Sequence, residues 1–190
     1  MTAGDKPGDE SLVEAWFGED FRRLSPDIQA LHRLGGRLEG DVIIQHGQGL
    51  SGVMGRRLSL RLGLPAKEGS AHMVVTIFSA ADGLHWDRQF NGGTTFRSLL
   101  QPHGHFPSGH WIEAAGRVQL TLQVAILGGG WHWVHKKTSL WGWTLPAWLQ
   151  PKTSACKVFR DGRYHFEVKL RWGSHLLVSY AGALKATLNH

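Results

Sequence analysis

The chain has 190 residues, of which 42% are hydrophobic and 19% are charged, so it suits one domain with a substantial core and excludes a largely disordered protein. Its formal net charge is +6, but the basic residues are scattered and form no nucleic-acid motif, so we expect no nucleic-acid partner. The single cysteine excludes an internal disulfide, and the apolar runs are too short for a membrane span, which together indicate a cytoplasmic protein.

The chain is expected to begin with a flexible leader over residues 1–16, followed by a single domain over residues 17–190. A helix is expected early in this domain. Ser25 supplies an N-cap, and Pro26 occupies the first helical position. Gly35 then ends the helix.

A second helix is expected over residues 50–62, between the first two strands. Its apolar side chains recur at helical spacing, which predicts one continuous stripe. The stripe comprises Leu50, Val53, Met54, Leu58, Arg61 and Leu62. We expect this helix to plug the concave face of a curved sheet.

Most of the remaining chain alternates apolar and polar residues with a period of two, which is typical of strands. By residue number, the expected strands are 38–45, 72–79, 84–90, 94–101, 111–115, 117–127, 131–141, 154–160, 164–172 and 176–184. A sheet of nine or ten antiparallel strands tends to curl. We therefore predict a mainly β (α+β) fold, in which these strands form an open or partly closed barrel around the one inserted helix.

The strand over residues 84–90 places a charged side chain among aromatic rings. Trp86, Arg88 and Phe90 share one face of this strand, and the two rings mark that face as inward. A guanidinium cannot lose its proton there, so it needs an anionic partner or water. Glu113, on another strand with apolar neighbours, is one candidate partner, and an acidic ligand is the other.

Two interpretations of this pair remain open. Arg88 and Glu113 can form a buried ion pair that fixes strand register. Alternatively, Arg88 holds a substrate carboxylate or enolate, and Glu113 transfers a proton. His46 and Tyr180 lie on inward-facing strand positions and are further candidates for proton transfer, with a core or rim histidine as the alternative for His46.

Aromatic side chains on inward faces predict a ligand pocket. We expect Trp86, Phe90, Phe96 and Phe166 to line it, together with Ser98, which shares a face with Phe96. Ser98 lacks the Gly-x-Ser-x-Gly setting of a hydrolase nucleophile.

The twelve histidines do not predict a metal site. His103 and His105 lie near each other in a loop, but no cysteine or carboxylate stands at ligand spacing beside them. His132 and His135 point to opposite faces of their strand. We expect no metal and no cofactor.

Several short motifs follow one another in a fixed order along the chain. They are Leu31-His32, Ile44 to Gly49 (IQHGQG), Leu64-Pro65, Trp86-x-Arg88-x-Phe90, Phe96-x-Ser98, Ile112-Glu113 before Gly116, Leu145-Pro146 with Leu149-x-Pro151, Tyr164-x-Phe166 and Tyr180-x-Gly182-x-Leu184. Over about Phe21 to Leu184, this set resembles an uncharacterised bacterial family, a domain of unknown function. The family is often found alone or C-terminal to a saccharopine-dehydrogenase-like domain.

The chain departs from that family at two positions. Ala114 and Ala181 stand where the family tends to have arginine. If those arginines bind a ligand, this chain has lost part of that capacity or uses it differently. The resemblance implies no assured activity, because the family itself lacks one.

We therefore expect a small-molecule-handling β-barrel whose ligand is apolar and carries an acidic or polar group. The leading hypothesis is a cofactor-independent biosynthetic enzyme that performs proton transfer, isomerisation or cyclisation. The alternative is a carrier or sensor of a hydrophobic ligand. A third hypothesis is a partner-binding module whose exposed tryptophans, such as Trp131 and Trp141, form an interface. The pattern also allows a homodimer.

Overall fold

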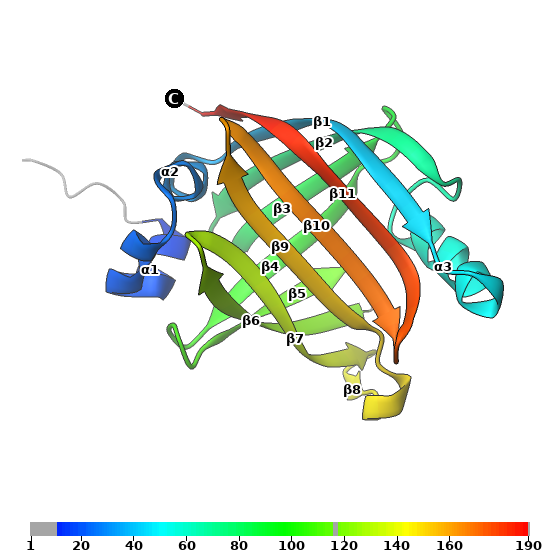
Figure 1. The fold of residues 1–190 in the computed structure, drawn as a ribbon. Helices are drawn as coiled ribbons and strands as arrows, with labels where there is room; N and C mark the ends of the chain where they lie inside the picture. Colours follow the sequence, from blue (N-terminus) through cyan, green and yellow to red (C-terminus); the bar gives the residue numbers. More distant parts are fainter. Residues whose placement is uncertain (1–10, 116–117, 190) are drawn as a thin grey trace, which may run out of the picture.

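The computed structural model describes residues 11–115 and 118–189. Its strands form an antiparallel barrel (Figure 1). The strand bounds are β1 Gly36–His46, β2 Gly69–Ala80, β3 Gly83–Phe90, β4 Phe96–His103, β5 His110–Ala115, β6 Val118–Leu127, β7 Gly130–Leu140, β8 Trp143–Thr144, β9 Lys152–Arg160, β10 Arg163–Trp172 and β11 His175–Leu188. Arg117, expected to begin the sixth strand, lies outside the described residues.

Ten of these strands close into a complete ring, and β8 pairs only with β7. The mainly β prediction is confirmed. Two pairings close the ring: β6 with β7, and β1 with β11 along its whole length, from Gly36 opposite Leu188 to His46 opposite Val178. The last strand continues beyond its expected end at residue 184, and those extra residues complete its pairing with β1.

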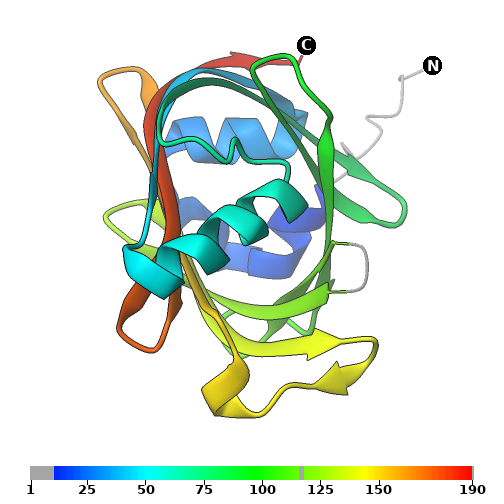
Figure 2. The same ribbon diagram turned by 90° about the vertical axis from the view of Figure 1, so that its right-hand side faces the viewer.

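Helices cover both ends of the barrel (Figure 2). The helices α1 (Leu12–Phe17) and α2 (Pro26–Leu34), joined by the 3-10 helix η1 (Gly18–Arg23), lie at one end. The helix α3 (Gly49–Arg61) lies at the other, and the short helix η2 (Ala147–Leu149) follows β8. Of the expected leader, residues 1–10 lie outside the described residues, whereas residues 12–16 belong to α1.

Aromatic rings seal the barrel end beneath α1. The Trp16 ring lies 5.3 Å from the ring of Trp111, and the Phe17 ring lies 5.1 Å from that of Trp131, both edge to face. Such pairs add to the stabilisation that comes from burying the rings themselves. The expectation that Trp131 is exposed is wrong, because it is 1% exposed within this cluster, whereas Trp141 is largely exposed.

Helix α3 forms where it was expected but turns a different face toward the barrel. Its buried residues are Gly52, Gly55 and Ser59, and Leu50 is 84% exposed. The reason is close approach to β11, since a Cβ atom at Gly55 would lie 1.9 Å from the carbonyl oxygen of Leu177. The predicted apolar stripe is therefore wrong for Leu50, Val53 and Met54, which are exposed, whereas Leu58, Arg61 and Leu62 do face the barrel interior. Helix α3 lies across the barrel end rather than against the concave face of the sheet (Figure 2).

Within the core, His32 of α2 is packed as a neutral ring. Its centroid lies 4.5 Å from that of Trp131 and 6.2 Å from that of Trp86. Burial, assisted by the nearby charge of Lys157, lowers the pKa of His32 from 6.5 to about 3. The folded protein therefore resists protonation of this ring where the unfolded chain accepts it.

The unfolding free energy should fall with acid because of this histidine. The contribution of the neutral His32 ring to the unfolding free energy is complete above pH 6.5, the pKa of histidine in the unfolded chain. It is lost as the pH falls toward about 3, the pKa of His32 in the folded protein. By linkage it amounts to as much as about 5 kcal/mol. In denaturant unfolding at a series of pH values, His32→Leu should show a flatter dependence than the wild type over this window. If the unfolding free energies of the two proteins change with pH in parallel, the pH dependence does not come from His32.

Candidate functional site

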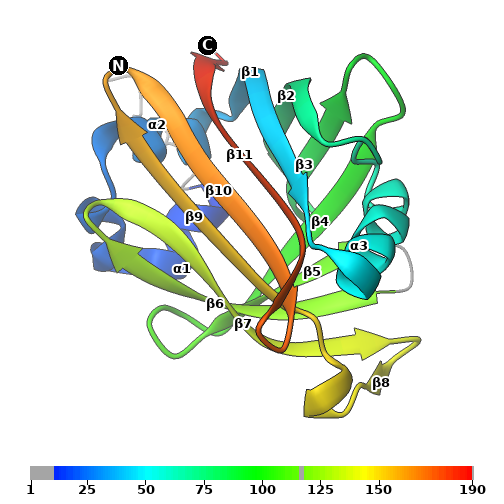
Figure 3. The same cartoon turned by 45° about the vertical axis from the view of Figure 1, so that its right-hand side comes forward.

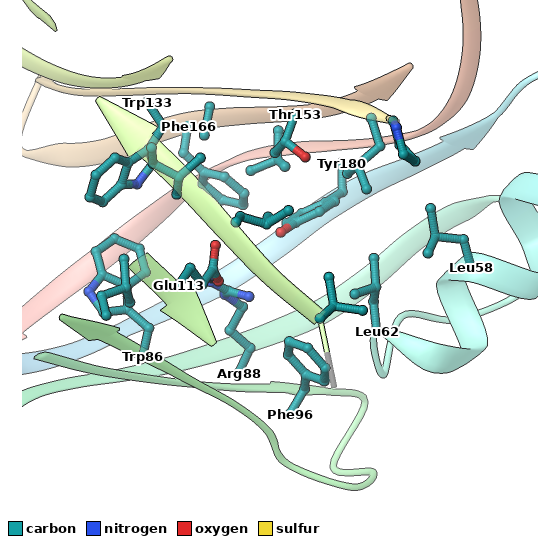
Figure 4. Close-up of a pocket in the computed structure, with 18 of the residues that line it drawn as sticks. Leu58, Leu62, Trp86, Arg88, Phe96, Glu113, Trp133, Thr153, Phe166 and Tyr180 are labelled. Atoms are coloured by element: carbon teal, nitrogen blue, oxygen red, sulfur yellow. Dashed lines mark hydrogen bonds and ion pairs between the residues drawn. The ribbon is translucent and has the colours of Figure 1, made fainter. Parts of the chain in front are cut away.

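The barrel encloses a cavity of about 660 Å³, within the range of about 300–1,000 Å³ usual for small-molecule sites. It extends from Trp86 and Trp133 to Leu58 and Leu62, which come from α3 and its C-terminal end (Figure 4). Most lining side chains are apolar. The lining residues with charged or hydroxyl side chains are Arg61, Arg88, Glu113, Thr138, Thr153, Lys157, Tyr164 and Tyr180.

Arg88 and Glu113 meet at the cavity wall. The Arg88 Nη2 atom donates to Glu113 Oε1 over 3.1 Å, and the two side chains are 18% and 15% exposed. Arg88 is on β3 and Glu113 on β5, so the pair spans the intervening strand β4. Along β4 their partners are Phe96 and Leu100, which means that the pair runs diagonally rather than directly across neighbouring strands.

The surroundings keep the Arg88 guanidinium charged. Burial alone would lower its pKa, but the neighbouring Tyr180, Glu113 and Tyr164 outweigh that effect and raise the pKa above its ordinary value. The guanidinium also lies 5.9 Å from the ring centroid of Phe96, within cation–π range. Arg88 is therefore a permanent positive charge beside an apolar cavity.

Lys157 is a second cation at the cavity, and the sequence analysis missed it. The side chain is 5% exposed, with Nζ 3.4 Å from the ring centroid of Trp86 and 5.1 Å from that of Trp133. Among the described residues, no carboxylate forms an ion pair with this amine. Burial and the nearby Arg88 charge lower the pKa of Lys157 well below 10.5, against a smaller opposing effect of Glu113.

The sequence offers little warning of this lysine. In β9, Ala155 and Lys157 share the inward face, while Ser154 and Cys156 lie on the other. Neither set is clearly more apolar than the other, so alternation does not decide the direction. The pairing of Lys157 with Trp131 of β7 settles it, and that pairing is visible only in the folded barrel.

Two tyrosines add hydroxyl groups to the site. Burial raises the pKa of both Tyr164 and Tyr180, although Arg88 opposes the effect. Both hydroxyls therefore remain protonated at neutral pH and can donate hydrogen bonds. The Tyr164 hydroxyl and the Trp86 indole N–H have no hydrogen-bond partner among the described residues. Buried polar groups are usually paired, so these two atoms are exceptions to that pattern.

Six of the nine predicted site residues line one cavity, which brings together β3, β4, β5, β10 and β11. They are Trp86, Arg88, Phe96, Glu113, Phe166 and Tyr180 (Figure 4). Phe90 and Ser98 are buried without lining it. The Phe90 ring packs edge to face on Tyr180 with centroids 6.0 Å apart, and Ser98 pairs with Trp86 across β3 and β4.

The structure separates His46 from the other candidates, because it does not line the cavity. Its Nε2 atom lies 2.8 Å from the Ser59 hydroxyl, which ties the end of β1 to α3. Burial lowers the pKa of His46, with Arg56 acting in the same direction and Glu68 opposing it. This geometry gives His46 a structural role in fixing α3.

Metal-binding groupings were sought among the described residues, and no set of three or more His, Cys, Asp or Glu side chains is arranged to hold an ion. His103 and His110 stack with their ring centroids 5.3 Å apart. His105 belongs to no such set either.

Comparison with known proteins gives one match. A family model described as a domain of unknown function, DUF4166, matches residues 24–184. The search of curated proteins and the search of solved structures found no match. The match supports the expected resemblance to an uncharacterised family.

Breaking the cavity ion pair on one side should cost more stability than removing both partners. Glu113→Gln leaves the Arg88 guanidinium without its carboxylate, and partial exposure reduces the usual penalty to about 2 kcal/mol. The double variant Arg88→Met/Glu113→Leu should unfold close to the wild-type midpoint. Urea denaturation measures both, and an equal loss in the two variants would argue against an unfavourable unpaired guanidinium.

Proposed function

We propose that this chain, which belongs to the DUF4166 family, binds an elongated apolar molecule with an anionic head group inside its barrel. The observation that carries the proposal is the charge balance of the cavity. Three basic residues, Arg61, Arg88 and Lys157, line the cavity with one carboxylate, Glu113, and the rest of the lining is mostly apolar. An anionic group would restore balance and give the Lys157 amine a counter-charge, which buried charges require.

The distribution of polar groups supports a head-first orientation. Lys157 lies against Trp86 at the inner end, and the Arg88–Glu113 pair lies between there and α3 (Figure 4). Toward α3 the lining is mostly apolar, with Phe96, Leu62 and Leu58, and Arg61 of α3 is the charged residue there. The head group would reach Lys157, while the tail would extend between these apolar side chains toward α3.

Binding without chemistry is the better-supported form of this hypothesis. Proton transfer was expected from His46, Glu113 and Tyr180, but His46 hydrogen-bonds Ser59 outside the cavity. The raised pKa of Tyr180 makes it a poor base near neutral pH. We therefore favour a carrier or sensor over a biosynthetic enzyme.

An enzyme that transfers protons remains the second candidate because of one observation. The lowered pKa of Lys157 makes this amine a better proton acceptor near neutral pH than an ordinary lysine. The two functions differ in the fate of the ligand. A carrier releases its ligand unchanged, whereas an enzyme returns an isomer or a cyclised product, and mass spectrometry with chromatography of the released molecule distinguishes them.

The charge of the head group should determine affinity. Oleate should quench the fluorescence of the cavity tryptophans with saturation, and Lys157→Met should weaken its binding about ten- to a hundredfold, the loss expected for one charge-assisted hydrogen bond. The same variant should leave the affinity for oleyl alcohol unchanged. Lys185→Met, which removes an exposed lysine from β11, is the matched control and should bind like the wild type.

Two results would count against the proposal. If neither oleate nor oleyl alcohol binds with saturation, the cavity is not the proposed ligand site. An equal effect of Lys157→Met on the acid and the alcohol would remove the anionic head group from the proposal and leave an apolar site.

Binding of the acid should also depend on pH. The pKa of Lys157 is lowered in the ligand-free protein and should rise when an anion binds beside the amine. At pH values between the ligand-free pKa and the ligand-bound pKa, binding therefore takes up a proton. Affinity for oleate should therefore fall as the pH rises toward 10.5, the ordinary lysine value, while affinity for the alcohol stays level. The fluorescence titration repeated at several pH values measures this. An affinity for oleate that rises with pH would contradict a charged Lys157 at the head group.

A further inference from the structure

The barrel end that carries α3 forms a surface distinct from the cavity wall. We call it the mouth surface and define it by residues 47–68, 141–152 and 171–175. The first two segments meet at the cavity, since Leu58 and Leu62 line it together with Trp141 and Leu145. The third joins the second through a hydrogen bond of 2.7 Å from the Trp172 indole to the Trp148 carbonyl oxygen. Figures 2 and 3 show this end opposite α1 and α2.

Exposed apolar side chains gather on the mouth surface. Of the fourteen large hydrophobic residues that are exposed in the described chain, eight belong to it. They are Leu50, Val53, Met54, Leu60, Trp141, Trp143, Trp148 and Trp172. Trp143 is 81% exposed. Scattered exposed apolar residues are normal, but a concentration at one end marks an interaction site.

Helix α3 contributes to this concentration because its orientation is the reverse of an ordinary surface helix. The small residues Gly52, Gly55 and Ser59 face the barrel, so larger side chains are left outside. Close contact with β11 at Gly55 leaves no space for a different rotation of the helix. The outward apolar side chains are therefore a fixed property of the packing.

The mouth surface is also strongly basic. Its three segments contain six basic residues and one acidic residue, Glu68. The basic residues are Arg56, Arg57, Arg61, Lys67, Lys152 and Arg171. Among the described residues, no carboxylate forms an ion pair with any of the three arginines of α3. Glu68 lies instead 3.8 Å from His46.

We infer that the mouth surface docks on an anionic membrane surface, with the α3 arginines at the lipid head groups and the exposed tryptophans at the interface. No helix among the described residues is long and apolar enough to cross a membrane. Tryptophan rings favour the head-group region, and basic side chains near an anionic surface add attraction to apolar burial.

Two other occupants fit the observations less well. A second copy related by two-fold symmetry would bring Arg56 and Arg57 toward the same basic face of its partner, which is unfavourable. A nucleic acid would satisfy the arginines but would leave Leu50, Val53 and Leu60 exposed. An anionic membrane satisfies both sets of side chains.

Docking in this way would bring the cavity mouth against the lipid. The inference goes beyond the proposed ligand and does not depend on it, because membrane binding is measured on vesicles with no added ligand. A protein that binds vesicles but no oleate would support the inference while contradicting the proposed function.

Vesicle co-sedimentation tests the docking. The protein should bind vesicles of mixed phosphatidylcholine and phosphatidylglycerol, and binding should fall as salt is raised. The double variant Arg56→Glu/Arg57→Glu should weaken binding roughly tenfold or more, as expected for two charges at an anionic surface. Trp143→Ser/Trp148→Ser should also weaken it and should reduce the blue shift of tryptophan emission that vesicles cause, because Trp141 and Trp172 remain.

The matched control is Arg160→Glu/Arg163→Glu, which makes the same charge change in the β9–β10 turn and should bind like the wild type. Far-ultraviolet circular dichroism confirms that every variant is folded. The inference is wrong if the control weakens binding as much as the α3 variant, or if pure phosphatidylcholine vesicles bind equally well. It is also wrong if the protein is a dimer that the tryptophan variant converts to a monomer, or if a short duplex DNA binds more tightly than the anionic vesicles.

Discussion

Closure of ten antiparallel strands into one ring of hydrogen bonds is the constraint on which the interior depends. Side chains can just fill a barrel of roughly eight strands, and the diameter grows with strand number. Ten strands therefore enclose more space than their own inward side chains occupy. Trp16, Phe17 and the helix α2 fill one end, and a volume of about 660 Å³ remains between this aromatic seal and α3.

Arg88 and Lys157, the basic residues in the interior of the cavity, respond to burial in different ways. Arginine keeps its proton in any protein environment, so Arg88 is accommodated by bringing Glu113 to it from a strand two positions away. Lysine can give its proton up, and Lys157 has aromatic rings instead of a carboxylate around its amine. The charge of Arg88 is thus fixed and that of Lys157 is adjustable, which suits the anion binding that we propose.

Much of this architecture could be predicted from the sequence, because strict alternation marks most strands and Gly-rich turns separate them. Arg88 was predicted to face inward because Trp86 and Phe90 flank it, and the structure agrees. Lys157 was missed because its strand carries no decisive alternation. The orientation of α3 was predicted wrongly because the glycines needed for close approach, such as Gly55, contribute nothing to an apolar pattern. Both errors concern distances between segments that are far apart in sequence.

The pairing of the first barrel strand with the last also bears on biosynthesis. While the ribosome is still translating, β1 exposes one unpaired edge, and that edge is covered only when residues 175–188 have emerged. An open strand edge is a template for pairing with other chains. Slow synthesis of residues 175–188 would therefore lengthen the time for which this edge of β1 is open to pairing with other chains.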